Sequence, residues 1–327
     1  MMKNSIKNFK RSQSFYSFIG LALVFVIASL IVKEFLTFNN IITVLRQGSV
    51  LLILSTGLTA VILTGNMDLS VGAASGLVGC LCAQLLKSGV PIPVVFVIGL
   101  ITGAIIGIFN GFLVGIVKLP SFIATYGTNW VVAGLSIIIM NGDIIYGLPE
   151  GFTWLGTGYV GPIPFIIIVA LIMVIVAYVM LQKTTFGRDI YAYGSNKDAA
   201  LYSAVPIKKT LFSAFIMSGV TAAIAGILMT ARLDAADSTM GDAYGLQTVA
   251  AVVVGGTSML GGEGGITGTV IGAILLTIIV NVMNLLGITS FAQPMVVGIV
   301  ILVMVLFDSY SRRRQNTTVK KDSKKSN

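Results

Sequence analysis

The chain has 327 residues, of which 56% are hydrophobic and 10% are charged, and its mean hydropathy is +0.96. One soluble core cannot hide this much apolar surface, so the composition excludes an ordinary globular domain and indicates a protein that the lipid bilayer solvates. The formal net charge is +9, and the charged residues are concentrated between long uncharged runs. These runs lack the polar–apolar alternation of barrel strands, so they predict helices.

Ten apolar stretches predict an all-α polytopic membrane protein with about ten transmembrane helices, some of them short or broken. A helix of roughly 20 residues crosses the hydrocarbon core, because each residue adds about 1.5 Å. We expect a terminal segment 1–14, a transmembrane domain 15–308 and a basic tail 309–327. The predicted spans are residues 15–33, 46–64, 70–86, 92–117, 121–140, 162–182, 210–231, 245–258, 265–287 and 290–307.

The positions of the basic residues predict the orientation of these spans. With both termini in the cytoplasm, all but four of the 21 Lys and Arg residues fall on the cytoplasmic side, as the positive-inside rule requires. The exceptions are Lys33, Arg46, Lys87 and Arg232. The outer loops would be 141–161 and 232–244, and the large inner loop 182–209. We therefore expect a multi-pass protein of the bacterial inner membrane.

The segment Thr64–Gly72 interrupts an otherwise continuous apolar stretch and carries an acid, Asp68. An ionised carboxylate is costly at membrane depth unless it meets water, a partner or a helix N-terminus. Asp68 and Ser70 could cap the following helix, whose first N–H groups need acceptors. Asp68 could also contact a transported solute, and the two roles are compatible.

Further polar side chains lie within or beside the next apolar spans, where they could bond helix to helix or contact a solute. Ser121, Thr125 and Thr128 share one face of a predicted helix because of their spacing. The candidate residues of a solute pathway are Asn66, Asp68, Ser70, Asn110, Thr125 and Asn129.

Glycines mark close helix packing and tight turns. Gly99, Gly103 and Gly107 recur every four residues, a spacing that favours close contact between helices. The run Gly261–Gly265 has neither the Lys nor the preceding strand of a phosphate-binding loop, so we interpret it as an interhelical turn. It follows AVVVGG at 251–256, which resembles AVILTG at 60–65 and suggests either an internal repeat or chance similarity.

The sequence contains no residue pattern of an enzyme or a metal site. There is no His, and Cys80 and Cys82 are two residues apart on a predicted helix, so they face different directions. No GxxxxGK[ST] motif for ATP is present. We therefore expect no catalytic residues, no cofactor and no metal.

The inner loop predicts one more helix. Asn196 is a good N-cap, residues 197–204 are compatible with a helix, and Pro206 would end it. So short a helix needs a surface to rest on, which could be a groove of a cytoplasmic partner or the chain's own membrane domain.

Five segments in order resemble the permease subunits of ribose-type ATP-binding-cassette (ABC) sugar importers. They read TGNMDLSVG, PSFIATYGTNW, TTFGRDIYAYGSNKDAA, AAVVVGGTSMLGGEGGITGTVIGA and, at Leu285–Ile288, LLGI. The resemblance runs from about Asn39 to Asp308. It implies the ABC importer permease fold and a non-enzymatic subunit. The implied partners are a cytoplasmic ATPase, an extracytoplasmic solute-binding protein and a second permease, identical or homologous; no nucleic acid is implied.

The resemblance also assigns the inner loop 182–209 to the docking of the ATPase. The matching positions are Arg188, Gly194, Asn196, Ala199 and Ala200. The chain departs from the family where Gly245-Leu246-Gln247 stands in place of Glu-Leu-Asp, and Asn66-Met67 in place of Gly-Ile. The loss of both acids disfavours ribose itself as cargo and leaves another pentose, a hexose, a nucleoside or a sugar-like signal open.

An ion-coupled secondary transporter that acts without an ATPase is the alternative interpretation. Such transporters usually carry titratable groups deep within their spans. The spans of this chain are nearly free of them, which favours the ATP-driven importer subunit.

Overall fold

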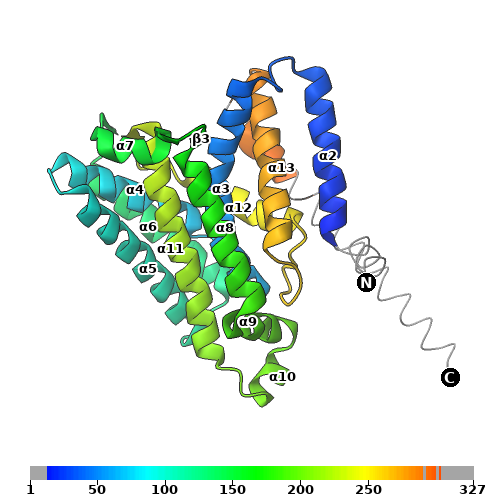
Figure 1. Cartoon of the computed structure of the whole chain (residues 1–327). Helices are drawn as coiled ribbons and strands as arrows, with labels where there is room; N and C mark the ends of the chain where they lie inside the picture. Colours follow the sequence, from blue (N-terminus) through cyan, green and yellow to red (C-terminus); the bar gives the residue numbers. More distant parts are fainter. Residues whose placement is uncertain (1–12, 290–291, 300–301, 303–327) are drawn as a thin grey trace.

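The computed structural model describes residues 13–289, 292–299 and 302, and in this part the chain is almost entirely helical (Figure 1). The long helices are α2 (Gln13–Ile31), α3 (Phe38–Leu63), α4 (Val71–Lys87), α5 (Ile92–Gly115), α6 (Ser121–Met140), α8 (Phe165–Lys183), α11 (Ile207–Leu233), α12 (Asp242–Val254) and α13 (Ile266–Leu285). The short helices are α7 (Glu150–Thr157), α9 (Thr185–Ser195) and α10 (Lys197–Tyr202). The strands are β1 (Ile145–Tyr146), β2 (Tyr159–Val160), β3 (Ile163–Pro164) and β4 (Ala235–Ala236).

The helices confirm an all-α polytopic membrane protein, although not the number of spans. Among the described residues, six helices are long and apolar enough to cross a membrane: α3, α5, α6, α8, α11 and α13. α4 has 17 residues and α12 only 13, so α12 extends about 20 Å, less than the thickness of the hydrocarbon core. The predicted span 290–307 lies only partly within the described residues. Residues 1–12 and the predicted tail 309–327 lie outside them.

Two loops predicted to be irregular contain regular structure. Residues 141–161 form β1, α7 and β2, and residues 232–244 contribute β4. β1 pairs antiparallel with β4, with Ile145 opposite Ala236, and the Leu148 N–H donates to Asp234 Oδ1 at 2.7 Å. These loops, which the sequence assigns to the outer side, thus bind each other at the end of the bundle that carries α7. α9 and α10 lie at the opposite end (Figure 1).

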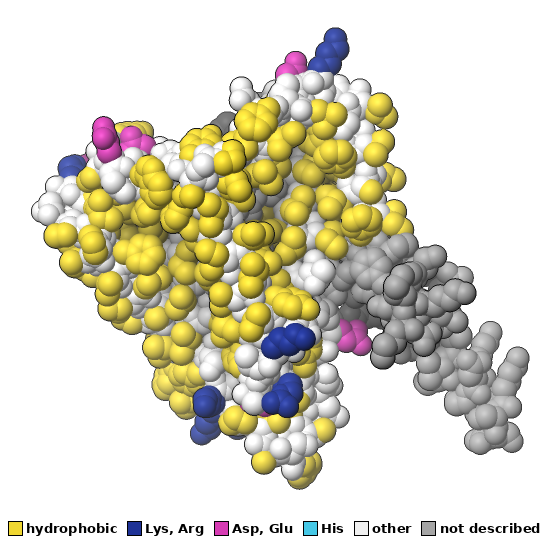
Figure 2. All heavy atoms as spheres, in the orientation of Figure 1, with side chains coloured by type: hydrophobic (Ala, Val, Ile, Leu, Met, Phe, Trp, Pro, Cys, Tyr) yellow, Lys and Arg dark blue, Asp and Glu magenta, His cyan; other side chains and the backbone are white. Residues whose placement is uncertain are grey.

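An apolar belt surrounds the bundle between two more polar ends. Large hydrophobic side chains are exposed on several helices, among them Leu30 (81% exposed), Trp130 (63%) and Ile138 (73%). Figure 2 shows yellow side chains over the flanks of this face, with the charged side chains gathered toward its two ends. Such a surface would be unstable in water, and its place is in lipid.

The core of the bundle is built by close packing of α5 on α11. A side chain at Gly103 would collide with the backbone of Gly219, and one at Gly107 with the carbonyl oxygen of Phe215. These contacts confirm that the glycines at four-residue spacing pack helices together. Without a hydrophobic drive between helices in lipid, such close approach is the main source of helix association.

The first prediction concerns this contact. Gly107→Val should destabilise the protein because the new side chain must separate α5 from α11, a cost of about 1–3 kcal/mol or more. Gly127→Val on α6 is the matched control, because a Cβ at Gly127 meets no atom within 4 Å. Thermal unfolding in detergent, followed by the loss of the monodisperse species, should show a lower midpoint for Gly107→Val alone. Equal midpoints for the two variants would contradict the packing.

Candidate functional site

Helix α3 ends at Leu63, and the chain stays non-helical until α4 begins at Val71. Gly65 has a φ of +70°, a conformation that favours glycine, and it turns the chain away from the helix axis. Residues that leave a helix at this depth expose N–H groups to a medium without water, so each group needs a partner within the protein. We call residues 64–70 the first break.

Asp68 is the centre of the first break and is almost fully buried. The N–H and hydroxyl of Ser70 donate to Asp68 Oδ1 at 3.0 and 2.6 Å. The hydroxyl of Ser218 on α11 donates to Asp68 Oδ2 at 2.8 Å. Asn110 on α5 donates to Ser70 Oγ at 2.8 Å and approaches Asp68 Oδ1 at 3.4 Å. One carboxylate thus connects the first break with two other helices.

This network changes the interpretation of Asp68 and Ser70. Ser70 occupies the N-cap position of α4, but its side chain makes no cap hydrogen bond. The expectation that the Ser70 side chain caps this helix is therefore wrong. Asp68 instead accepts the N–H of Ser70. In this conformation Asp68, Ser70 and Asn110 are sealed inside the bundle, with at most 1% exposure each.

The start of α6 satisfies two further backbone N–H groups of the first break. The N–H of Met67 donates to Ser121 Oγ, and that of Leu69 donates to Thr125 Oγ1, each at 3.1 Å. Thr128 bonds within its own helix, to Ala124 O at 3.1 Å. Ser121 and Thr125 therefore bind the first break to α6. Such bonding between elements was one of the two roles that the sequence allowed for these residues, beside contact with a solute.

The other two candidates lie apart from the network. Asn66 donates to Thr64 Oγ1 at 2.9 Å and is 9% exposed. Asn129 is half-buried, and its side chain has no hydrogen-bond partner among the described residues. The structure therefore brings together Asp68, Ser70, Asn110 and Thr125, and leaves Asn129 outside.

A second break separates α12 from α13 and lies directly against the first. Residues 255–265 are non-helical, and Gly261 and Gly262 have φ values of +87° and +75°, so the predicted turn is confirmed. The N–H of Gly262 donates to the Leu63 carbonyl at 2.9 Å. A Cβ at Gly65 would lie 2.9 Å from Leu260 O. The two glycine turns that sequence similarity relates are thus in backbone contact.

The inner helix α9 rests on both breaks. A Cβ at Gly194 would overlap the carbonyl oxygen of Leu63, so this backbone approach requires glycine. The Tyr191 hydroxyl donates to Gly264 O at 2.9 Å and accepts from Gln182 at 3.0 Å. Burial raises the pKa of this hydroxyl, which keeps it protonated as a donor. We call the contact of Leu63, Gly65, Gly194, Gly261 and Gly262 the break junction.

Helix α10 follows, and its beginning agrees with the sequence. The N–H of Ala199 donates to Asn196 Oδ1 at 2.9 Å, which confirms the predicted N-cap. Of the two alanines that match the family's docking loop, only one is exposed. Ala199 is exposed, whereas Ala200 is 3% exposed and packs with Tyr193 and Leu211. Ala200 belongs to a small core within the loop. Neighbouring residues on a helix face different directions, so Ala199 can be exposed while Ala200 is buried.

The exposed face of α10 carries two residues that sequence reasoning missed. Leu201 is 60% exposed and Tyr202 is 89% exposed. Arg188 on α9 is also exposed. If Ala200 faces inward, the helical periodicity of α10 places Leu201 and Tyr202 on other faces, so their exposure could have been predicted.

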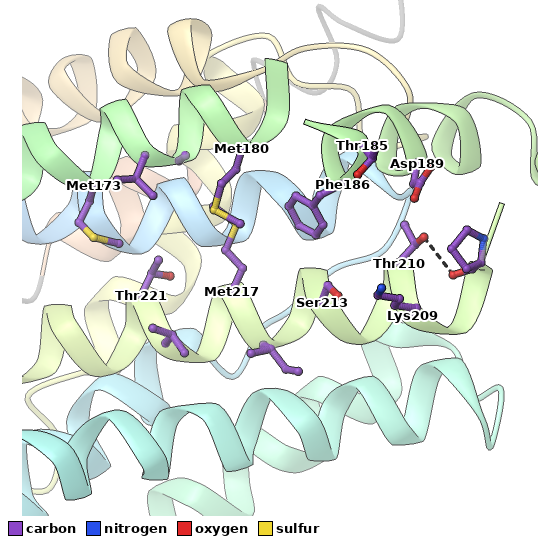
Figure 3. Close-up of a pocket in the computed structure, with 15 residues that line it drawn as sticks. Met173, Met180, Thr185, Phe186, Asp189, Lys209, Thr210, Ser213, Met217 and Thr221 are labelled. Carbon is purple, nitrogen blue, oxygen red and sulfur yellow. Dashed lines mark hydrogen bonds between the residues drawn. The ribbon is translucent and has the colours of Figure 1, made fainter. Parts of the chain in front are cut away.

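A cavity of about 560 Å³ lies between α8, α9 and α11, on the α9 side of the bundle (Figure 3). Met173, Met180 and Met217 line its apolar part, and Asp189 and Lys209 stand near its other end. None of the candidate pathway residues lines this cavity.

The second prediction tests the break junction. Gly194→Ala should displace α9 from Leu63 and weaken the link between the inner helices and the breaks, without touching the exposed face of α10. Thermal unfolding in detergent should show a lower midpoint for Gly194→Ala, because the added methyl group overlaps Leu63 O at an overpacking cost of about 1–3 kcal/mol. Gly127→Ala, which adds the same methyl group in open space, should behave as wild type. A wild-type midpoint for Gly194→Ala would contradict this contact.

Comparison with known proteins relates this arrangement to a transport family. Residues 40–307 match the family model described as the permease component of branched-chain amino acid transport systems. The chain is 39% identical to the ribose import permease protein RbsC of Haemophilus influenzae, over 95% of this chain and 98% of the relative. It is 41% identical to RbsC of Bacillus subtilis, over 89% and 91% of the two chains. It is 36% identical to the D-allose transport system permease protein AlsC of Escherichia coli, over 89% and 90%.

No solved structure matches the chain. The family match covers the spans from α3 onward, both breaks and the inner helices α9 and α10, and the relatives match it nearly end to end. The chain therefore belongs to this family of membrane permease components of transport systems.

Proposed function

We propose that this chain is the membrane-spanning permease subunit of an ABC importer for a monosaccharide or a sugar-like solute. A separate cytoplasmic ATPase would drive transport, and an extracytoplasmic binding protein would deliver the solute. The observation that carries the proposal is the near full-length similarity to two ribose import permeases and a D-allose permease.

The proposed orientation places α9, α10 and both termini in the cytoplasm of a bacterium, and α7 outside. Support comes from the distribution of Lys and Arg along the sequence. Further support is that α7 lies at one end of the bundle and α9 and α10 lie at the other (Figure 1). The permease would work with a second permease, identical or homologous.

The proposed docking site for the ATPase is the exposed face of α9 and α10. Its members are Arg188, Ala199, Leu201 and Tyr202. Exposed Tyr, Leu and Arg side chains together resemble the centre of a protein interface, where aromatic residues and Arg contribute most of the binding energy. Asn196 would cap α10, and Ala200 would pack it against the rest of the loop. A movement of α9 on ATPase docking would reach the breaks through the contact of Gly194 with Leu63.

The proposed solute route passes the first break, with Asn66, Asp68, Ser70, Asn110, Thr125 and Asn129 as candidate residues. In the described conformation the Asp68 network is closed. Its hydrogen bonds would have to open for a solute to reach these groups. These hydrogen bonds would then break and form again during transport. A network that joins the first break to α5, α6 and α11 suits such a role.

The third prediction tests the source of energy. Vesicles that contain the full-length chain, its co-purified ATPase and its binding protein should accumulate a radiolabelled sugar from a ribose and allose panel only when ATP is hydrolysed. Vesicles with the chain alone should accumulate none under a proton or sodium gradient. Gradient-driven accumulation without the ATPase would instead establish the ion-coupled secondary transporter.

The fourth prediction tests the docking face. Tyr202→Glu should lose the ATPase on purification, because a carboxylate replaces an aromatic contact and must be desolvated in the interface, at a cost of about 2 kcal/mol or more. Tyr202→Phe, which keeps the ring, should retain the ATPase. Both variants should insert normally, since Tyr202 is 89% exposed. Wild-type retention of the ATPase by Tyr202→Glu would exclude this face.

A further inference from the structure

A second cavity, of about 260 Å³, lies at the end of the bundle opposite α9 and α10. It is formed by the beginning of α3, the end of α11, the beginning of α12, the end of α13 and Gln293. We call it the outer amide pocket. Its polar lining side chains are Gln47, Arg232, Tyr244, Gln247, Thr277, Asn284 and Gln293.

Most of these polar groups have no partner in the part of the chain that the structure describes. Gln293 donates to Asn284 Oδ1 at 2.6 Å, but the side chains of Gln47 and Gln247 make no hydrogen bond to any described residue. Arg232 Nε is buried and also lacks an acceptor. Gln47 and Gln247 are half-buried, whereas Arg232 Nε is fully buried. A buried guanidinium nitrogen without an acceptor is costly, so it indicates a site that water or a ligand fills.

The chemistry of the lining selects the ligand. Gln47, Gln247 and Asn284 carry amides, each of which both donates and accepts, and Tyr244 has a hydroxyl with the same property. A ring of neighbouring hydroxyl groups has matching donors and acceptors. No acidic side chain lines the pocket, so a cationic ligand would find no counter-charge.

The size of the cavity agrees with a small polyol. Pockets for drug-sized ligands range from about 300 to 1,000 Å³, and the outer amide pocket is smaller. A compact ligand of the size of one sugar ring suits it better than a nucleoside or a disaccharide.

The pocket is also connected to the breaks. It draws on α3, which leads into the first break, and on α12, which leads into the second. The N-terminal turn of α12 packs against the start of α4, where a Cβ at Gly72 would lie 2.6 Å from the Gly245 nitrogen. Gly72 is two residues from Ser70 of the Asp68 network. A movement of the first break would therefore shift the helix that carries Tyr244 and Gln247.

We propose that the outer amide pocket is a binding station for a neutral, polyhydroxylated solute of monosaccharide size, entered from the outer side before the breaks open. This inference rests on the proposed function, and it adds the residues that would hold the solute. Gln247 is the central specificity residue, since its amide is unpaired and lies on α12, the helix that contacts the first break.

Uptake measurements with one matched pair of variants test the station. Gln247→Leu keeps the size of the side chain and removes both hydrogen-bonding groups, so uptake of radiolabelled D-ribose or D-allose should fall about 5- to 10-fold. The yield of assembled complex should stay at the wild-type level, since Gln247 is half-buried and makes no hydrogen bond to any described residue. Thr248→Val is the control, because Thr248 is fully buried, does not line the pocket, and bonds through its hydroxyl to a backbone carbonyl of its own helix. It should keep wild-type uptake.

Thiol labelling of intact cells provides an independent measurement. Gln247→Cys should react with an impermeant methanethiosulfonate from outside, and D-ribose or D-allose should slow the reaction. Thr248→Cys, which points into the protein, should stay unreactive, as should the buried Cys80 and Cys82 of the wild type.

The outcomes separate this inference from the proposed function. If the wild-type complex imports neither sugar under ATP, the proposed function fails. If it does import sugar, the station is contradicted by wild-type uptake in Gln247→Leu or by labelling of Gln247→Cys that no sugar slows. If only the anion D-gluconate slowed the labelling of Gln247→Cys, the pocket would bind an acid, and the proposal of a neutral ligand would be contradicted.

Discussion

Every backbone N–H and carbonyl inside the membrane must find its partner within the protein, and the two helix breaks depend most on this constraint. At the first break, the N–H groups of Met67 and Leu69 are satisfied by hydroxyl groups of α6, and that of Ser70 by Asp68. At the second break, the N–H of Gly262 is satisfied by the carbonyl of Leu63. Interruptions that would be unstable alone thus become the places where the helices are joined.

The same constraint explains how distant parts of the permease can act together. Because each break is satisfied by other elements, neither can move without changing its partners. The inner helix α9 contacts both breaks through Gly194 and Tyr191, while α10 exposes Leu201 and Tyr202 at the end of the bundle. On the other side, α12 links the outer amide pocket to the first break. The proposed docking face, the two breaks and the outer amide pocket are therefore connected by direct contacts.

Much of the fold could be predicted from the sequence, because membrane spans are long apolar runs that need no knowledge of their neighbours. α6 has the predicted bounds and α5 begins at the predicted residue, and the Asn196 cap follows from local chemistry. α7 and the pairing of β1 with β4 could not be predicted, since strands of two residues have no periodicity. The burial of Ala200 could not be predicted, because its partners, Tyr193 and Leu211, come from other elements.

The candidate site shows the same division. Asp68, Ser70, Asn110 and Thr125 could be recognised as polar groups in apolar surroundings, but their joining into one closed network depends on packing. Ser218, which completes the network, gives no separate signal in the sequence. The outer amide pocket collects residues from four helices and Gln293, and only the folded chain brings them together.

The break junction is the central claim, and amide hydrogen exchange of the lipid-reconstituted protein tests it most directly. A peptide that covers residues 258–265 reports on the bond from Gly262 N–H to Leu63 O. We predict that the Gly262 amide is protected from exchange in the wild type and loses protection in Gly194→Ala, while Gly127→Ala leaves it unchanged. Rapid exchange of the Gly262 amide in the wild type would contradict the junction and the coupling that depends on it.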